Sequence, residues 1–314
     1  MKKKLDWFRD RKWGVFFHYL DTVQNDPGFS PGNSLNMGAG ETPWDDCVNA
    51  LDVEKLAGQL ARTNAGYLIF SVMQCTRHMC APNAAYDRIT GYRPGEACSR
   101  RDLIADLIAA LDRYCIPLFL YYTGDGPLQD RQAGQAMGFT GDGAHVTGEF
   151  VGRWAEVAAE YSLRYGKSVK GWWVDGCYRN LGYTDELHGV LSEGLRAGNP
   201  DALLAFNGGV MNRVVSYSSR DDYTCGEMNR LEGLPESRFL NGAQWHILAP
   251  LGAVPEGMAP YDAWARPGCQ YTADYLRQYL ANVNERGGVV SMDAALFRDG
   301  SMDEGQLELL CSLP

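Results

Sequence analysis

The sequence predicts an α/β chain folded as a single (β/α)8 barrel of the TIM type. Three observations support this prediction: eight short apolar runs recur along the chain, amphipathic patterns lie between several of them, and the eighth run ends shortly before the C-terminus. A barrel of this kind takes about 250 residues, so 314 residues accommodate one barrel with long loops. An open doubly wound sheet is the competing arrangement, and the position of the eighth run favours the barrel.

The strands are predicted from the apolar runs, each of which is short and ends in a polar or turn residue. Strands buried on both faces, as in a parallel sheet, have continuous apolar runs rather than an alternating pattern. The runs cover residues 13–18, 67–73, 117–122, 171–175, 203–207, 222–227, 244–248 and 289–293. The sixth and seventh are the least regular, because Thr224 and Gly226 interrupt one and His246 interrupts the other.

Helices are predicted where apolar residues recur at spacings of three and four. Such patterns cover residues 53–60, 103–111, 150–165 and 275–283. Asp52, Asp102 and Thr184 lie at or near the starts of helical segments, where a side-chain oxygen can accept from free backbone amides. Strands that alternate with helices pair in parallel, because a parallel neighbour is reached only through a crossover.

Two stretches rich in glycine and proline, at about residues 25–45 and 125–148, lack an apolar period and are predicted to be long loops. Both follow a strand, which places them at the carboxyl ends of the strands, where barrel enzymes carry their sites. No linker marks a second domain, so residues 1–314 are predicted to form one catalytic barrel.

The composition argues against several classes of protein. A formal net charge of -10 repels phosphate backbones, so a nucleic-acid partner is not expected. An uncharged apolar run of about 18 residues, as a membrane span needs, is absent, and the basic N-terminus lacks the apolar region of an export signal. Nine cysteines at mostly long spacings fit reduced thiols better than a disulfide framework. We therefore expect a cytoplasmic protein without a cofactor, for which a homo-oligomer remains open.

Polar and aromatic residues end most of the predicted strands, and a barrel brings the strand ends into one ring. The residues at the strand ends are His18, Met73 with Gln74, Tyr122, Asp175, Asn207, Glu227, Trp245 with His246, and Asp293. Cleavage of a glycosidic bond requires two carboxylates in different environments, because one attacks or activates water while the other protonates the leaving oxygen. Aromatic faces suit the apolar face of a sugar ring, although the same ring of residues would suit other hydrolases.

Asp175 is the leading candidate for a catalytic carboxylate. It ends the buried run GWWVD, with Trp173 on the same face at a spacing of two and a glycine following that permits the exit turn. The alternative is an aspartate that caps the next segment through backbone amides. Glu227 is the second candidate, although the neighbouring Asp221 and Asp222 are equally consistent with an acidic surface loop.

Structural alternatives also exist for the other polar residues. His18 is either a core histidine bound to a backbone carbonyl or a ligand for a substrate hydroxyl, and Asp293 is equally consistent with a structural role. The spacing of Cys75, His78 and Cys80 is similar to that of metal ligands. No second ligand pair lies at a known spacing, so a metal-dependent hydrolase is the lesser alternative.

The order and spacing of these motifs resemble the catalytic domain of the α-L-fucosidases of glycoside hydrolase family 29. The resemblance covers nearly the whole chain and rests on LDWFRDRKWGVFFH ending at His18, DLIADL from Asp102 ahead of LFLYYTG, WWVDG around Asp175, residues 222–227 and 244–245, and YLANVNERGGVVS from Tyr279. It implies a barrel and a retaining double displacement in which Asp175 is the nucleophile and Glu227 the acid/base. It also implies that the β-sandwich that usually follows this barrel is missing.

Three motifs depart from the family pattern. The paired His-His-Asp-Gly after strand two is replaced by QCTR from Gln74, the Glu-Trp pair of the first loop becomes PW ending at Trp44, and the arginine after strand five is missing at Asn207. These positions contact sugar hydroxyls in the family. The resemblance therefore supports the catalytic chemistry more strongly than the recognition of fucose.

The sequence thus predicts a retaining exo-glycoside hydrolase similar to α-L-fucosidases, with an oligosaccharide or glycoside as substrate. The predicted catalytic pair is Asp175 and Glu227, and the predicted sugar-binding residues are His18, Trp44, Gln74, Tyr122, Trp173, Asn207, Trp245 and His246, with no metal ligand. The alternatives are a glycosidase of the same family acting on another sugar, and a non-catalytic carbohydrate-binding barrel.

Overall fold

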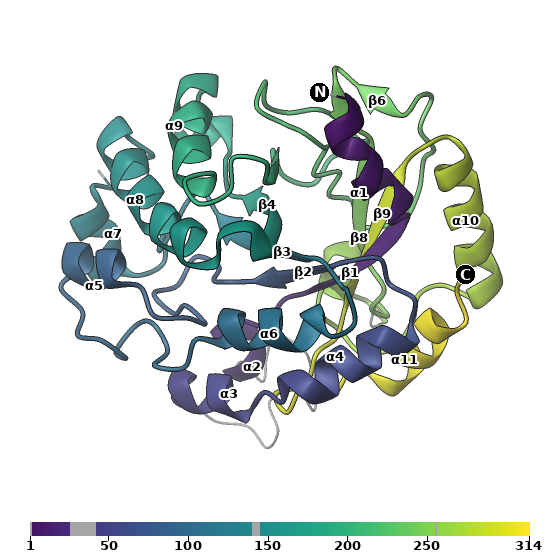
Figure 1. Cartoon of the computed structure of the whole chain (residues 1–314), viewed down its shortest axis with the longest axis horizontal. Helices are drawn as coiled ribbons and strands as arrows, with labels where there is room; N and C mark the ends of the chain where they lie inside the picture. The colour runs from purple at the N-terminus through teal and green to yellow at the C-terminus, as the bar shows by residue number, and fades with distance from the viewer. Residues whose placement is uncertain (1, 26–41, 140–144, 255) are drawn as a thin grey trace.

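A curled parallel β-sheet forms the centre of the computed structural model, which describes residues 2–25, 42–139, 145–254 and 256–314 (Figure 1). Its seven strands lie in the order β5-β4-β3-β2-β1-β9-β8, and every neighbouring pair is parallel. The strands are β1 (Trp13–Phe17), β2 (Leu68–Ser71), β3 (Leu118–Thr123), β4 (Val169–Asp175), β5 (Leu203–Phe206), β8 (His246–Pro250) and β9 (Val289–Ala294). The predicted α/β class and barrel type are confirmed.

The predicted sixth strand is wrong as a strand, although its residues occupy the expected place between β5 and β8. The segment 222–228 touches both neighbours through isolated bridges and single hydrogen bonds, such as Asp222 N to Leu204 O at 2.8 Å and Met228 N to Leu248 O at 2.9 Å. Gly226 has a φ of +60°, which a regular strand does not allow. The sixth of the eight predicted strand positions is therefore filled by irregular backbone.

The predicted seventh strand is divided into two elements. β7 (Ala243–Gln244) pairs with β6 (Phe239–Leu240) as a small antiparallel ribbon, and β8 then joins the main sheet. Trp245 lies between the two elements, so the run predicted as one strand serves two sheets.

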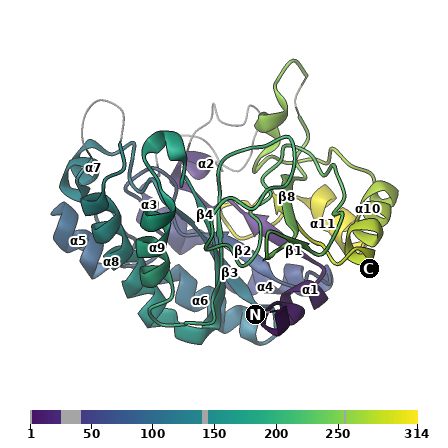
Figure 2. The same cartoon turned by 90° about the horizontal axis from the view of Figure 1, so that it is seen from above.

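All four predicted helices are present: α4 (Val53–Arg62), α6 (Leu103–Asp112), α8 (Gly148–Tyr165) and α10 (Ala273–Glu285). Asp52, Asp102 and Thr184 accept hydrogen bonds from backbone amides at the first turns of α4, α6 and α9 (Asp185–Leu195), as predicted. The remaining helices are α1 (Asp6–Asp10), α2 (Asp21–Asn25), α3 (Trp44–Ala50), α5 (Ala84–Thr90), α7 (Arg131–Met137) and α11 (Glu304–Cys311). Figure 2 shows α5, α7, α8 and α9 on one side of the strands and α10 and α11 on the other.

The two predicted long loops are only partly loops. Within the stretch 125–148, α7 forms a helix capped by Asp130, and α8 begins at Gly148, while residues 140–144 lie outside the described part of the chain. Within the stretch 25–45, α3 begins at Trp44, and residues 26–41 lie outside the described part. A short helix with small or polar residues carries too little apolar period to be recognised from its sequence.

The core has two layers, one between the sheet and its helices and one inside the barrel. The inner layer is aromatic, and α1 contributes Phe8, which is fully buried with its ring 5.1–5.4 Å from those of Tyr67, Phe119 and Tyr223. Phe8 thus closes the barrel at the amino ends of its strands, and a ligand can approach the interior from the carboxyl ends. The nine cysteines are free thiols. Among the described residues, no helix is long and apolar enough to cross a membrane.

Candidate active site

Asp175 ends β4 at the carboxyl edge of the sheet, where three donors converge on its two oxygens. Oδ1 accepts from Tyr178 Oη at 2.9 Å and from Asn207 Nδ2 at 2.8 Å, and Oδ2 accepts from Tyr121 Oη at 2.8 Å. Burial, followed by the charge of Asp175, raises the pKa of Tyr121 and Tyr178 well above the usual range of tyrosine, so both phenols stay protonated and donate. Asp175 is therefore held in one orientation. All three donors are side chains, whereas the alternative role as a helix cap would require backbone amides.

Glu227 lies beside Asp175, and one side chain joins the two carboxylates. Asn207 Nδ2 donates to Asp175 Oδ1 at 2.8 Å and to Glu227 Oε2 at 2.6 Å, while Asn207 Oδ1 accepts from Gly209 N. The bond from Gly209 fixes which end of the amide faces the carboxylates. Because the two bonds meet at one nitrogen, Asp175 Oδ1 and Glu227 Oε2 lie at most 5.4 Å apart, the sum of the two lengths.

Burial raises the pKa of Glu227 to about 8, with a further contribution from the negative charge of Asp175 and an opposing one from the hydrogen bond of Asn207. Near neutral pH the Glu227 side chain is therefore mostly protonated. Two carboxyl groups at one site thus differ in environment, one bound by three donors and the other shielded from water. This difference allows them to take different roles in acid/base chemistry.

A cavity of about 290 Å³ opens directly above these carboxylates. Its polar lining comprises His18, Thr22, Gln74, Tyr121, Asp175 and Glu227, and its apolar lining comprises Phe16, Leu20, Val23, Trp173, Val210, Leu248, Tyr261, Trp264 and Ala265. The cavity is thus mainly aromatic and aliphatic, with polar groups gathered around Asp175 and Glu227. Such a lining is typical of sites for small ligands.

Three of the predicted sugar-binding residues line this cavity, and a fourth, Asn207, is buried beside the two carboxylates. His18 follows β1 and lines it, and Trp173 lines it with its indole stacked on Tyr121 at 5.5 Å. Gln74 also lines it and donates to Tyr121 Oη at 2.8 Å, so it supports Asp175 through that phenol. Asn207 joins the two carboxylates. Their contacts with a substrate remain predictions.

The other four predicted sugar-binding residues lie elsewhere, and their assumed positions need correction. Tyr122 is fully buried on the outer face of β3, where its ring stacks on Trp154 at 4.8 Å. His246 is fully buried inside the barrel, bound to Thr224 O and Ser291 Oγ, and burial lowers its pKa to about 4. Neither side chain lines the cavity above the carboxylates.

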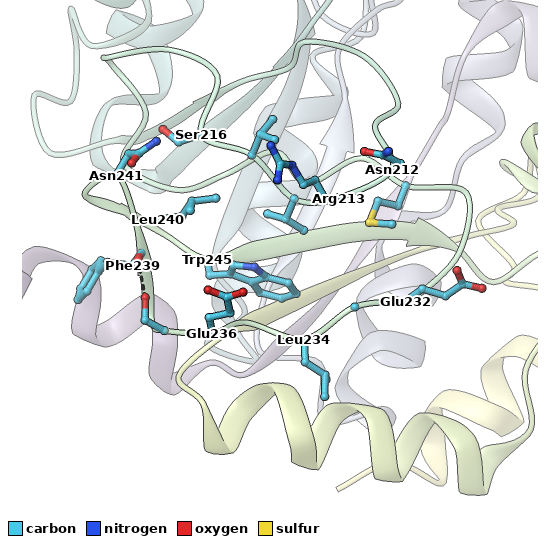
Figure 3. Close-up of a pocket in the computed structure, with 15 residues that line it drawn as sticks. Asn212, Arg213, Ser216, Glu232, Leu234, Glu236, Phe239, Leu240, Asn241 and Trp245 are labelled. Carbon is cyan, nitrogen blue, oxygen red and sulfur yellow. Dashed lines mark hydrogen bonds between the residues drawn. The ribbon is translucent and has the colours of Figure 1, made fainter.

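Trp44 and Trp245 line different cavities from the one above the carboxylates. Trp44 is almost fully buried at the start of α3 and donates from Nε1 to Met79 O. Trp245 forms part of the wall of a cavity of about 660 Å³ between the segments 212–216 and 232–241 (Figure 3). A tryptophan at a strand end points into the barrel or away from it, and Trp245 points away.

Three residues around the carboxylates were not predicted from the sequence: Tyr121, Tyr178 and Trp264. Tyr121 shares the face of Trp173 and Asp175, because the register between β3 and β4 pairs Tyr121 with Trp173 and Thr123 with Asp175. The spacing within β3 alone does not distinguish Tyr121 from Tyr122. Tyr178 and Trp264 lie outside strands and have no such signal. Trp264 lines the cavity with its ring perpendicular to that of His18 at 5.8 Å.

The cysteine and histidine cluster noted in the sequence has other partners. Cys75 donates to Asp125 Oδ2 at 3.5 Å, Cys80 donates to Ser71 O at 3.4 Å, and the His78 ring faces Trp44. Asp125 is buried beside Gly176, and burial together with the charge of Asp175 raises its pKa to about 7. Among the residues that the structure describes, no group of three or more His, Cys, Asp or Glu side chains is placed to hold a metal ion.

Replacing Asn207 by alanine is expected to shift the pH dependence of any reaction that uses Glu227 as an acid. The hydrogen bond from Asn207 lowers the pKa of Glu227, so its loss raises that pKa and moves the alkaline limb of kcat/KM to higher pH. We expect kcat/KM itself to fall by about 10- to 100-fold, as for the loss of a hydrogen bond to a charged group. A pH–rate profile measures both effects, with the exposed Asn212→Ala as control. An unmoved limb would contradict the assigned bond.

The fold of this chain is similar to that of known structures. No protein-family model matches the sequence, and no curated protein matches it. An endo-fucoidan hydrolase of glycoside hydrolase family 107 superposes with a TM-score of 0.68 at 12% identity, covering 99% of this chain and 53% of that one. The chain thus spans about half the length of that hydrolase.

Two α-L-fucosidases are similar to the same extent. Alpha-L-fucosidase isoenzyme 1 from Paenibacillus thiaminolyticus has a TM-score of 0.66 at 15% identity, covering 99% of this chain and 74% of that one. A GH29 α-L-fucosidase from Bacteroides thetaiotaomicron, trapped as a covalent intermediate, has a TM-score of 0.64 at 15% identity with the same coverage. The chain therefore shares its α/β barrel fold with fucose-acting glycoside hydrolases of families 29 and 107.

Proposed function

We propose that this protein is a retaining glycoside hydrolase that cleaves α-L-fucosides from the end of a glycan. The observation that carries the proposal is the pair Asp175 and Glu227, whose nearest oxygens are at most 5.4 Å apart across Asn207. Retaining glycosidases hold their carboxyl groups about 5–5.5 Å apart, whereas inverting ones need about 6.5–9.5 Å to admit a water. The similar folds of fucosidases, one of them trapped as a covalent intermediate, support the same reaction class.

In the first step, Asp175 attacks the anomeric carbon while Glu227 donates its proton to the leaving oxygen. Oδ2 of Asp175 is the better placed attacking atom, because it accepts one hydrogen bond whereas Oδ1 accepts two. The glycosidic bond breaks as the Asp175–sugar ester forms, and the leaving group departs as an alcohol. Glu227 can act as the acid because burial keeps it mostly protonated near neutral pH.

In the second step, Glu227 is the base that removes a proton from water. The water attacks the anomeric carbon, Asp175 leaves as a carboxylate, and Glu227 regains its proton. Asn207 stays bound to both side chains through the cycle and offsets part of their mutual repulsion. The sugar is released with the configuration that it had in the substrate.

The cavity supports a single sugar ring as the group that is bound. Its volume of about 290 Å³ lies at the lower end for ligand sites, which favours removal of a terminal residue over cleavage within a chain. Its apolar wall, including Val210 and Trp264, suits a sugar with an apolar substituent, and His18 and Gln74 are available for hydroxyl groups. These features support a 6-deoxy sugar such as fucose.

A panel of nitrophenyl glycosides tests the proposal, with α-L-fucoside and its close stereochemical relatives included. We expect release of nitrophenol from the α-L-fucoside, with NMR showing the α-anomer as the first product. An initial β-anomer would remove Asp175 from its role as nucleophile. Cleavage of fucan chains without cleavage of the monosaccharide would indicate endo action, and saturable sugar binding without any hydrolysis would indicate a carbohydrate-binding barrel.

A further inference from the structure

Asp293 is a buried carboxylate that contacts two different walls of the cavity. It lies in β9 opposite Phe16 of β1 and is 1% exposed. Its Oδ1 is 2.8 Å from His18 Nδ1, and its Oδ2 accepts from the backbone N–H of Ala265 at 2.6 Å. One side chain thus binds both the histidine that follows β1 and the turn that follows Trp264.

The turn that Asp293 holds has an unfavourable backbone conformation. Ala265 has a φ of +56°, in the left-handed region that residues with a Cβ rarely adopt. The turn is packed closely on its other side by the backbone of Gly252. A Cβ added at Gly252 would lie 2.1 Å from Ala263 O in the same turn. The bond from Ala265 N to Asp293 compensates for this strain and holds Trp264 beside the ring of His18.

We propose that Asp293 is a positioning residue that fixes His18 in the tautomer with its proton on Nδ1. Asp293 accepts that proton in a hydrogen bond, which leaves Nε2 as the nitrogen available to the cavity. An unprotonated Nε2 accepts a hydrogen bond and therefore selects a substrate hydroxyl that donates one. With its second oxygen, Asp293 fixes the opposing Trp264 wall. The substrate role of His18 rests on the proposed function, whereas the tautomer does not.

The substitution Asp293→Asn is expected to reverse the tautomer of His18, because an asparagine accepts with one atom and donates with the other. Ala265 N–H needs the acceptor, so the amide nitrogen must face His18. His18 then has to accept at Nδ1 and carry its proton on Nε2, which turns the nitrogen facing the cavity into a donor. An aspartate that sets a histidine tautomer in this way is known from catalytic triads.

The test is the ring tautomer of His18, read by 15N NMR of the free protein at neutral pH. The chain has five histidines, and His18→Ala assigns the signal. His246, whose Nδ1 is 2.8 Å from a backbone carbonyl, provides an internal example of the Nδ1–H form. We expect Nδ1–H for wild-type His18 and Nε2–H in Asp293→Asn, with His246 unchanged. Asp52→Asn, a capping aspartate of α4, is the control.

Kinetics provide the second readout. With an aryl α-L-fucoside, Asp293→Asn is expected to lower kcat/KM by about 10- to 100-fold, because the nitrogen that faces the substrate hydroxyl no longer accepts its hydrogen bond. The melting temperature should stay close to that of the wild type. A wild-type His18 that carries its proton on Nε2, or on both nitrogens, would overturn the proposal, as would a variant with unchanged tautomer and rate. A tautomer switch in a protein that cleaves no fucoside would instead refute the proposed function and leave the positioning role intact.

Discussion

Replacing Asp175 by alanine is expected to reduce the turnover of an aryl α-L-fucoside by at least about 1,000-fold, because the covalent step loses its nucleophile. The fold should survive. Asp175 is only partly buried at the end of its strand, and the groups that bind it can be hydrated through the open cavity. Thermal unfolding monitored by circular dichroism checks this, with Asp274→Ala as a control in which the carboxylate is almost fully exposed.

Added azide distinguishes a nucleophile from an aspartate that only binds substrate. In Asp175→Ala the small anion can occupy the space of the lost carboxylate and attack the anomeric carbon from the same side. We expect partial recovery of the rate with activated substrates and a β-configured glycosyl azide as the product. Near-normal activity of the variant without azide would contradict the assignment of Asp175, whatever the role of Glu227.

The sequence predicted Asp175 and Trp173 correctly as neighbours, because the alternation of side chains along one strand is a local property. It did not reveal which tyrosine of β3 faces them. That depends on the register between β3 and β4, which pairs Tyr121 with Trp173. Register is a property of two segments far apart in the chain, and Tyr121 and Asp175 are 54 residues apart. Tyr122 was therefore placed in the site although its ring packs outward against Trp154.

The segment 222–228 shows a different limit. Thr224 has the composition of a strand residue, but its hydroxyl donates to His246 O and accepts from His246 N, taking over bonds that a strand would make through its backbone. Gly226 adds a positive φ where its backbone packs against β8. An apolar pattern predicts burial and position in the barrel, but it does not tell whether side chains or backbone make the hydrogen bonds.

Predicted sugar-binding residues lie outside the cavity above Asp175 whether they were assigned through the resemblance or as strand ends. Trp44 was assigned through the resemblance and Trp245 as the end of a predicted strand, and both side chains line other cavities. Asn207 was proposed as a donor to the sugar, whereas its amide joins the two carboxylates. A motif gives the position along the chain, and the direction of a side chain depends on packing that only the folded structure contains.

Replacing Glu227 by alanine is expected to slow substrates according to their leaving group. The leaving groups of alkyl fucosides and natural glycans are poor and need a proton to depart as alcohols, so the rates of these substrates should fall by about 100- to 10,000-fold. Nitrophenolate and fluoride depart without protonation, so the first step of nitrophenyl and fluoride substrates should be almost unaffected. Equal losses for both kinds of substrate would indicate that another residue is the acid. The matched control is Glu236→Ala, an exposed glutamate outside the cavity above Asp175.

The pH dependence provides an independent test of the same residue. An acid catalyst is active in its protonated form, and burial raises the pKa of Glu227 to about 8, so kcat/KM of the wild type should be maintained to about that pH and then fall tenfold per unit. The usual range of a glutamate, about 4.3, would instead place the fall well below neutrality. In Glu227→Gln the fall near pH 8 should disappear for activated substrates, because no proton is left to lose. If the fall persists, the proton belongs to another group, and Asp125, whose pKa is raised to about 7 beside the same nucleophile, becomes the residue to substitute next.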